Sequence, residues 1–80
     1  MSREETISLP DLECPMPVLR AKKQLAKLEP GDVLRVESTD KHSFADLAQF
    51  CSQTGHDLVS QASEERSGRT WFITTIRRKA

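Results

Sequence analysis

Two cysteines, Cys14 and Cys51, are the residues of this 80-residue sequence best suited to chemistry. A thiolate attacks sulfur, so an exposed and partly ionised cysteine can take up a sulfur atom or exchange with a disulfide. Cys14 is followed by Pro15, Met16 and Pro17. Prolines suit the first turn of a helix, where the N–H that they lack would be unpaired anyway. The motif therefore predicts a stiff backbone that holds the Cys14 thiol outward at the start of a helix.

The start of a helix carries partial positive charge, and this charge should favour the thiolate form of Cys14. Arg20, Lys22 and Lys23 follow within the next turns and could add to the effect. The alternative is an unreactive cysteine that fills space beside the helix. The spacing of the residues leaves both interpretations open.

Cys51 shares a predicted helix face with Phe44 and Leu47, which favours a buried structural cysteine over a resolving thiol. His42 and His56 raise the question of a metal site. The sequence has no Cys-x-x-Cys or His-x-x-x-His pair that would form half of one, so we expect no metal. We expect His56 to cap or pack at the start of the third strand, and His42 to be a solvated loop residue.

Met16, Leu19 and Phe50 fall outside the apolar helix stripes or at their edges. Met16 and Leu19 are close to Cys14 and could form an apolar contact for partner proteins. Charge complementarity could come from three basic residues of the same helix: Arg20, Lys23 and Lys27. The alternative is a solvated helix face, which we favour for the lysines, whereas we favour docking for Met16.

Periodicity and turn residues predict strands at residues 6–9, 33–37, 58–62 and 71–76. Helices are expected from residue 15 to about 28 and from residue 40 or 43 to a left-handed stop at Gly55. Either Asp40 or Ser43 can cap the second helix, and Ser43 with Asp46 three residues on is a weak form of the capping box. The order β-α-β-α-β-β predicts one domain over residues 1–80 with right-handed crossovers and a final hairpin. We expect an α/β (α+β) two-layer sandwich, a four-stranded mixed sheet with two helices packed on one face.

The twelve basic and twelve acidic residues cancel, so no net charge draws the chain to nucleic acid or to anionic membranes. The N-terminal residues lack the apolar core of a signal peptide, and no run is long enough to span a bilayer. We therefore expect a cytoplasmic protein with reduced cysteines. An RNA-binding sheet would need exposed aromatic residues on adjacent strands, and only Trp71 and Phe72 are candidates. We expect neither nucleic acid nor membrane as a partner.

Several segments resemble the TusA (SirA-like) family of sulfur carriers, and together they cover nearly the whole chain. They are Leu12-Glu13-Cys14-Pro15-Met16-Pro17-Val18-Leu19 with Lys22-Lys23, Pro30-Gly31-Asp32, Thr39-Asp40, Asp46, Phe50-Cys51 and Gly55-His56-Asp57-Leu58. The Cys-Pro-x-Pro sequence at the mouth of the first helix is the motif that defines this family.

The resemblance implies that Cys14 accepts sulfane sulfur as a persulfide from a cysteine desulfurase and hands it to a downstream relay protein. In the family the relay often ends in 2-thiouridine of tRNA, and other members serve molybdenum-cofactor enzymes or cytoplasmic sulfur oxidation. Such a protein is a covalent persulfide carrier, a sulfurtransferase without turnover of its own, and needs no cofactor. We expect a monomer. A regulatory docking module with an unreactive cysteine is the alternative.

The sequence departs from the family pattern at Asp11, where a glycine is usual, and at Lys41, where a proline is common. Aspartate tolerates a positive φ better than most residues, so the loop can keep its shape at a cost. The negative charge of Asp11 near Cys14 should oppose thiolate formation.

Overall fold

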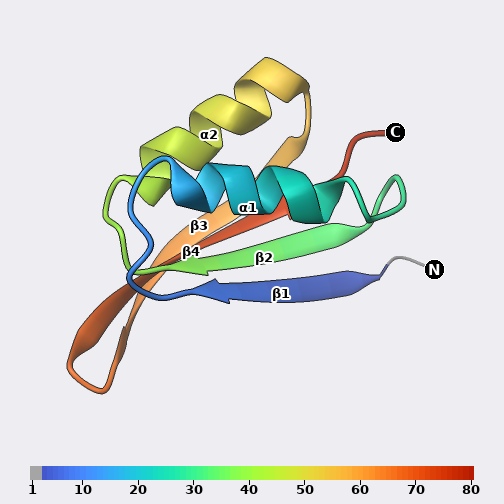
Figure 1. Cartoon of the computed structure of the whole chain (residues 1–80). Helices are drawn as coiled ribbons and strands as arrows, with labels where there is room; N and C mark the ends of the chain where they lie inside the picture. The colour runs from blue at the N-terminus through green and yellow to red at the C-terminus, as the bar shows by residue number, and fades with distance from the viewer. Residues whose placement is uncertain (1–2) are drawn as a thin grey trace.

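The computed structural model describes residues 3–80 as a four-stranded sheet with two helices on one face (Figure 1). The elements are β1 (Glu4–Leu9), α1 (Met16–Leu25), β2 (Val33–Ser38), α2 (Ser43–Thr54), β3 (Asp57–Arg66) and β4 (Arg69–Arg77). The predicted order, mixed sheet and one-sided helix layer are confirmed.

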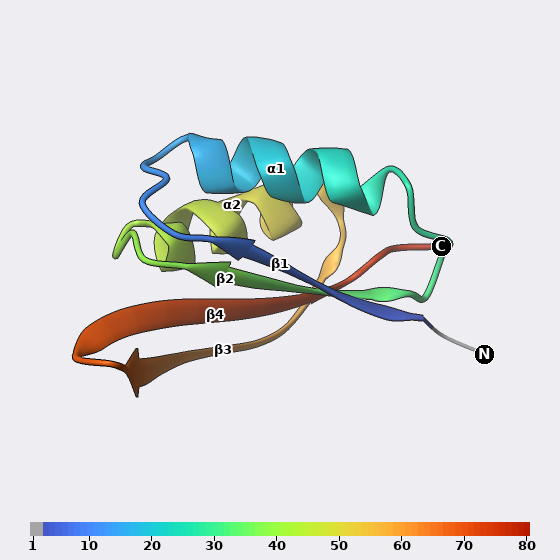
Figure 2. The same ribbon diagram turned by 60° about the horizontal axis from the view of Figure 1, so that its bottom comes forward.

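The strands lie in the order β1-β2-β4-β3 (Figure 2). β1 and β2 are parallel, as a strand-helix-strand crossover requires, and β4 runs antiparallel to both of its neighbours. β3 therefore lies at one edge of the sheet, and the predicted hairpin places β4 between β3 and β2. The other edge is β1.

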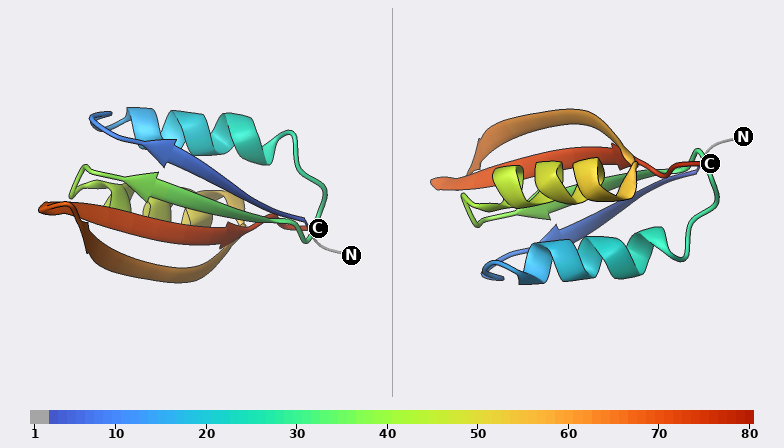
Figure 3. Two further views of the ribbon diagram at one scale, coloured as in Figure 1. Left: turned by 90° about the horizontal axis from the view of Figure 1, so that it is seen from below. Right: turned by 90° about the horizontal axis from the view of Figure 1, so that it is seen from above.

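The core lies between the sheet and the two helices (Figure 3). Leu34 and Val36 alternate with polar residues along β2 and are fully buried, as expected of a strand with one face covered. Leu25 of α1 and Leu47 of α2 reach the same cluster. The positions of the loops at the ends of the sheet follow from this packing.

α1 ends at Leu25, three residues earlier than predicted. The N–H of Lys27 donates to the carbonyl of Gln24 at 3.0 Å, and that of Leu28 donates to Leu25 at 3.1 Å. These bonds span three residues, so the last turn is tighter than an α-helix. Leu28 is still buried, because the tightened turn brings it back to the core.

The final hairpin is longer than predicted, because a two-residue turn continues the pairing up to Arg66 and Arg69. Ser67 and Gly68 both have positive φ, 52° and 77°. A two-residue hairpin turn in which both residues have positive φ has a twist that matches the right-handed twist of the flanking strands. β3 alone is a weak strand former, and its pairing with β4 overrides that weakness.

The start of α2 differs from the predicted capping box. His42 precedes the first helical residue, and no side chain caps the helix there. The Ser43 hydroxyl is buried without a hydrogen-bond partner among residues 3–80. Asp40, the other predicted cap, accepts the N–H of His42 at 2.9 Å. At the far end Gly55 has a φ of 85°, which confirms the predicted left-handed stop.

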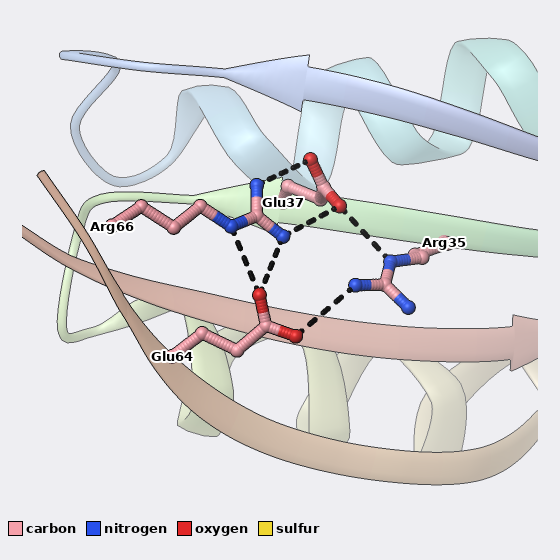
Figure 4. Close-up of polar contacts among 4 residues, drawn as sticks. All are labelled: Arg35, Glu37, Glu64 and Arg66. Carbon is pink, nitrogen blue, oxygen red and sulfur yellow. Dashed lines mark hydrogen bonds and ion pairs between the residues drawn. The ribbon is translucent and has the colours of Figure 1, made fainter.

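The sheet face opposite the helices carries a cluster of four charged side chains, the outer-face cluster: Arg35, Glu37, Glu64 and Arg66 (Figure 4). Ile73 lies opposite Glu37 on this face and is only 5% exposed. The guanidinium of Arg66 lies over the ring of Trp71, 5.4 Å from its centroid. Ion-paired side chains thus cover the centre of a face that has no helix layer.

Trp71 and Phe72 do not form a joint stacking surface. They are consecutive residues of β4 and therefore point to opposite faces. Trp71 lies beneath Arg66, and Phe72 packs edge-on against Phe44 with ring centroids 5.2 Å apart. This arrangement lacks the adjacent aromatic platform on which bases stack in RNA-binding sheets.

Candidate functional site

Cys14 lies in the loop between β1 and α1, immediately before the helix, and its side chain is exposed. The loop between β2 and α2 lies at the same end of the molecule (Figure 1). The N–H of Cys14 donates to the Asp40 carboxylate at 2.7 Å and joins the two loops. The structure therefore holds the thiol on the surface at one end of the sheet, as the Cys-Pro-x-Pro motif predicts.

Asp40 organises this end of the molecule. One of its carboxylate oxygens accepts the N–H of Cys14, and the other accepts the N–H of His42. Its own N–H donates to the Ser38 hydroxyl at 3.0 Å. The bonds from His42 and Cys14 lower the pKa of the Asp40 carboxyl, so it is ionised at neutral pH. Sequence reasoning considered Asp40 as a helix cap and did not foresee that it holds the Cys14 loop.

The pKa of the Cys14 thiol is raised, contrary to the prediction from the helix start. The largest cause is hydrogen bonding to the Asp46 carboxylate, followed by desolvation and by the negative charges of Asp46 and Asp40. An anionic neighbour opposes formation of a second anion. The predicted preference for thiolate is therefore wrong for the free protein, whose Cys14 is a protonated thiol at neutral pH.

The first turn of α1 offers few free donors that could stabilise a thiolate. Pro15 and Pro17 have no N–H, and the N–H of Met16 donates to the carbonyl of Glu13 at 2.8 Å. The N–H of Cys14 itself is bonded to Asp40. The prolines that present the thiol thus also weaken the electrostatic effect of the helix start.

Asp11 has a φ of 65°, which confirms the positive φ expected where the family pattern has glycine. Its carboxylate pairs with Arg69, and its N–H donates to the Thr39 hydroxyl at 2.9 Å. The carboxylates that raise the pKa of the Cys14 thiol are Asp46 and Asp40. The expected opposition to thiolate is real, but it comes from these two residues and not from Asp11.

Two shallow hollows meet at Cys14. One, of about 420 Å³, is lined by Cys14, Glu13, Asp40 and His42. The other, of about 220 Å³, has Cys14, Pro15 and Val18 on one side and residues of α2 on the other: Asp46, Gln49, Phe50 and Gln53. A thiol between two open hollows is accessible to a reacting sulfur atom of another protein.

The structure separates the residues predicted to dock partners into two groups. Met16 and Leu19 are 37% and 51% exposed, and both lie within a few residues of Cys14. Phe50, also considered to be at the edge of a stripe, is buried at 7% exposure. The basic residues Arg20, Lys23 and Lys27 line a different groove, between α1 and β1, to which Cys14 does not contribute.

Cys51 is buried in the core cluster, which confirms its predicted structural position. Burial raises the pKa of its thiol. His56 packs against Phe50, with ring centroids 5.8 Å apart, and its Nδ1 accepts the N–H of Lys79 at 3.0 Å. His42 is largely exposed, and its Nδ1 lies 3.1 Å from the Asp40 carboxylate.

Among residues 3–80, no group of three or more histidine, cysteine, aspartate or glutamate side chains is arranged to hold a metal ion. Within the same range, neither helix combines the length and the apolar character needed to cross a membrane. The chemistry that this end of the molecule offers is that of the Cys14 sulfur and the carboxylates around it.

A family model and individual relatives both relate this chain to sulfur carrier proteins. The family model described as sulfurtransferase TusA matches residues 5–78. A putative sulfur carrier protein of Neisseria meningitidis is 46% identical over 61 residues, which are 76% of this chain and 82% of that protein. The sulfur carrier protein TusA of Allochromatium vinosum is 39% identical over 70 residues, 88% of this chain and 90% of that protein.

A solved structure has the same fold. The crystal structure of a SirA-like protein from Desulfitobacterium hafniense superposes with a TM-score of 0.71 at 30% identity, over 95% of this chain and 99% of the other. Sulfur carriers have sulfur donors and acceptors as partners, and the family resemblance inferred from the Cys-Pro-x-Pro motif is confirmed. The chain belongs to the TusA family of sulfur carrier proteins.

Proposed function

We propose that this protein carries sulfur as a persulfide on Cys14, taken from a cysteine desulfurase and passed to a downstream relay protein. The observation that supports this proposal is the exposed Cys14 thiol between two hollows, within the Cys-Pro-x-Pro motif. Pro15 and Pro17 hold the thiol at the helix start. Met16 and Leu19 give donor and acceptor an apolar contact beside it.

The transfer balances without a cofactor. The Cys14 thiol loses its proton, and the thiolate attacks the outer sulfur of the donor's persulfide. A new S–S bond forms on Cys14 as the donor's S–S bond breaks, and the donor leaves as a thiolate that takes up a proton. In the second step a thiolate of the acceptor attacks the outer sulfur of the Cys14 persulfide, and Cys14 returns to the thiol.

Because its pKa is raised, Cys14 is a protonated thiol between transfer cycles. Asp46 and Asp40 lower the thiolate fraction of the free protein below that of an ordinary cysteine, so a partner that offsets their negative charge would speed the attack. A donor with basic residues around its own cysteine would do so on docking. Reactivity would then coincide with formation of the correct complex.

Loading of Cys14 is tested with a cysteine desulfurase, cysteine and pyridoxal phosphate, followed by intact-protein mass spectrometry with and without reductant. We expect a reductant-labile gain of one sulfur atom in the wild type and in Cys51→Ser, and none in Cys14→Ser. Cys51→Ser serves as the matched control because it removes the other thiol. Loss of the added sulfur from a folded Cys51→Ser protein would mean that the two cysteines have been assigned the wrong roles.

For the destination of the sulfur we propose 2-thiouridine of tRNA, in a cytoplasmic relay in which this protein acts as a monomer. Deletion of its gene should lower tRNA 2-thiouridine, measured by mass spectrometry of nucleosides. Wild type should restore the nucleoside, and Cys14→Ser should not. Unchanged 2-thiouridine would instead favour sulfur oxidation or molybdenum-cofactor supply. Restoration by Cys14→Ser would favour a regulatory docking module, which does not need the thiol.

A further inference from the structure

A groove of about 290 Å³ runs between α1 and the β1 edge of the sheet, away from Cys14. Figure 3 shows α1 on the β1 side of the sheet and α2 on the side of β3 and β4. The groove is lined by three consecutive residues of β1, three residues of α1 and one residue of the turn that follows α1: Ile7, Ser8, Leu9, Arg20, Lys23, Gln24 and Lys27. We call it the β1–α1 groove.

β1 has a free edge along this groove. It pairs with β2 on one side, and no strand within residues 3–80 pairs on the other. The N–H of Val33 donates to the carbonyl of Arg3, and the backbone groups of a strand point alternately to its two sides. The N–H and C=O groups of Thr6 and Ser8 therefore point away from β2. An edge of this kind accepts another extended chain.

The groove is basic although the chain as a whole has no net charge. Arg20, Lys23 and Lys27 line it, and no acidic residue does so within the described chain. Glu5, which accepts a hydrogen bond from the groove residue Gln24, is also ion-paired with Arg3. The three cations thus face the groove without a lining carboxylate to neutralise them.

The spacing of the cations suits an extended chain. Arg20 and Lys23 are three residues apart on α1, which is about 4.5 Å along its axis, and Lys27 follows in the tighter turn beyond the helix. Alternate residues of a strand present their side chains to one face about 6.7 Å apart. An added strand with acidic residues at every second position would therefore present its carboxylates along the line of the three cations, whose long side chains can span the difference in spacing.

We propose that the β1–α1 groove binds an extended acidic segment of a partner protein, which adds to the sheet at β1 and pairs its carboxylates with Arg20, Lys23 and Lys27. Phosphate oxygens could bind the cations and accept from the free N–H groups of β1, but they have no donor for its C=O groups, whereas an extended peptide satisfies both. The surface is separate from the persulfide site, and the Cys14→Ser variant can be used to study it. Failure of one proposal therefore leaves the other open to its own test.

Binding is tested by NMR titration of ¹⁵N-labelled Cys14→Ser protein with acetyl-Thr-Glu-Val-Glu-Thr-Glu-amide. We expect shift changes and slower amide exchange centred on Thr6 and Ser8. The peptide with lysine in place of glutamate should bind at least about tenfold more weakly, because the groove is cationic. Equal binding of both peptides, or changes centred on residues 39–42, would contradict the proposal.

Variants of this protein test separately how the lysine charges and the backbone edge of β1 contribute to peptide binding. The double variant Lys23→Glu/Lys27→Glu should bind the acidic peptide about tenfold more weakly than the wild type. Lys22 is an exposed residue of α1 outside the groove, and the affinity of Lys22→Glu should stay within about twofold of the wild-type value. Ser8→Pro removes an outward N–H and is compatible with an edge strand. It should abolish binding while the sheet resonances persist.

Modified peptides provide a measurement that does not depend on folding of the variants. In the bound peptide, the backbone N–H groups of every second residue face β1, and those of the other residues point away. N-methylation of the residues whose N–H groups face β1 should therefore abolish binding. N-methylation of the other residues should leave binding unchanged. If neither set matters, the peptide binds through its side chains only and strand addition is wrong. Tighter binding of tRNA or of anionic vesicles at Thr6 and Ser8 would likewise overturn the assignment.

Discussion

Cys14, the residue that we propose to carry sulfur, lies in an acidic environment. Hydrogen bonding to Asp46, with its charge and that of Asp40, raises the pKa of the Cys14 thiol. A thiol attacks sulfur and oxidants more slowly than a thiolate does. An exposed cysteine that must wait for its partner is thereby protected from reaction with other species.

Asp46→Asn should lower the pKa of the Cys14 thiol, because it removes the acceptor that favours the protonated form and the negative charge that raises this pKa most. At neutral pH the thiolate fraction then rises, and alkylation of Cys14 by iodoacetamide should be several-fold faster. The measurement is the pH dependence of the alkylation rate, followed by peptide mass spectrometry. The inflection should move to lower pH.

Asp11→Asn is the matched control for this experiment. It also removes one negative charge, from the loop that carries Cys14, but the Asp11 carboxylate is paired with Arg69. We expect an alkylation profile close to that of the wild type. If Asp11→Asn and Asp46→Asn gave equal shifts, the reactivity of Cys14 would depend on the general charge of this end of the molecule and not on Asp46.

At the scale of the elements, the loops at one end of the sheet matter more to Cys14 than the helix that it precedes. α1 presents the thiol, but its prolines leave few donors to stabilise an anion. α2 contributes Asp46 from its first turn, and the preceding loop contributes Asp40. Two strand-to-helix connections thus meet to form one site.

The β3–β4 hairpin offers a test at the same scale. Ser67 has a φ of 52° in the two-residue turn and is followed by Gly68. Asparagine tolerates this conformation better than serine, and Asn-Gly is the preferred pair for such turns. Ser67→Asn should raise the free energy of unfolding by about 0.5 kcal/mol, measured by urea denaturation.

Ser67→Ala is the control for the hairpin prediction. Alanine is equally small, but it lacks the polar side chain that helps aspartate and asparagine to adopt positive φ. This variant should be no more stable than the wild type. A gain of stability in both variants would show that loss of the serine hydroxyl, and not the turn conformation, is responsible.

At the scale of the whole molecule, the protein is a two-layer sandwich whose second face is covered by charged side chains. Glu37 is only 12% exposed and bonds to both Arg35 and Arg66. The outer-face cluster shields Ile73 from water. Small domains bury a smaller fraction of their surface than large ones, so a single core stabilises them less. We therefore expect the outer-face cluster to contribute to the free energy of unfolding of this protein.

Glu37→Gln should lower the free energy of unfolding by about 1–2 kcal/mol, because two arginines lose their charged acceptor at a largely buried position. Bonding to Arg66 lowers the pKa of the Glu37 carboxyl. Its contribution is therefore complete above the unfolded value of 4.5 and is lost as the pH falls below it.

The measurement for Glu37 is urea denaturation between pH 7 and pH 3. The difference between wild type and Glu37→Gln should shrink as the pH falls below 4.5. Glu4→Gln is the control, since Glu4 is an exposed residue of the edge strand β1. A constant difference between wild type and Glu37→Gln at every pH would show that the amide disturbs packing and that the charge is not what stabilises the cluster.

The sequence by itself determined the order of the elements, the exposed Cys14 and the buried Cys51. Hydrophobic periodicity, prolines and Gly55 are local signals, and each was sufficient because it acts within its own element. The family could also be identified from a local motif, the Cys-Pro-x-Pro sequence.

Only the tertiary structure decided the protonation state of Cys14 and the grouping of the basic residues. The charges of Asp40, in the loop before α2, and of Asp46, in the first turn of α2, act on the thiol, and β1 meets Arg20, Lys23 and Lys27 across a groove. Interactions between charges depend on distance in space, which sequence patterns do not contain. Local rules therefore located the thiol, and the packing of α2 beside α1 fixed its pKa.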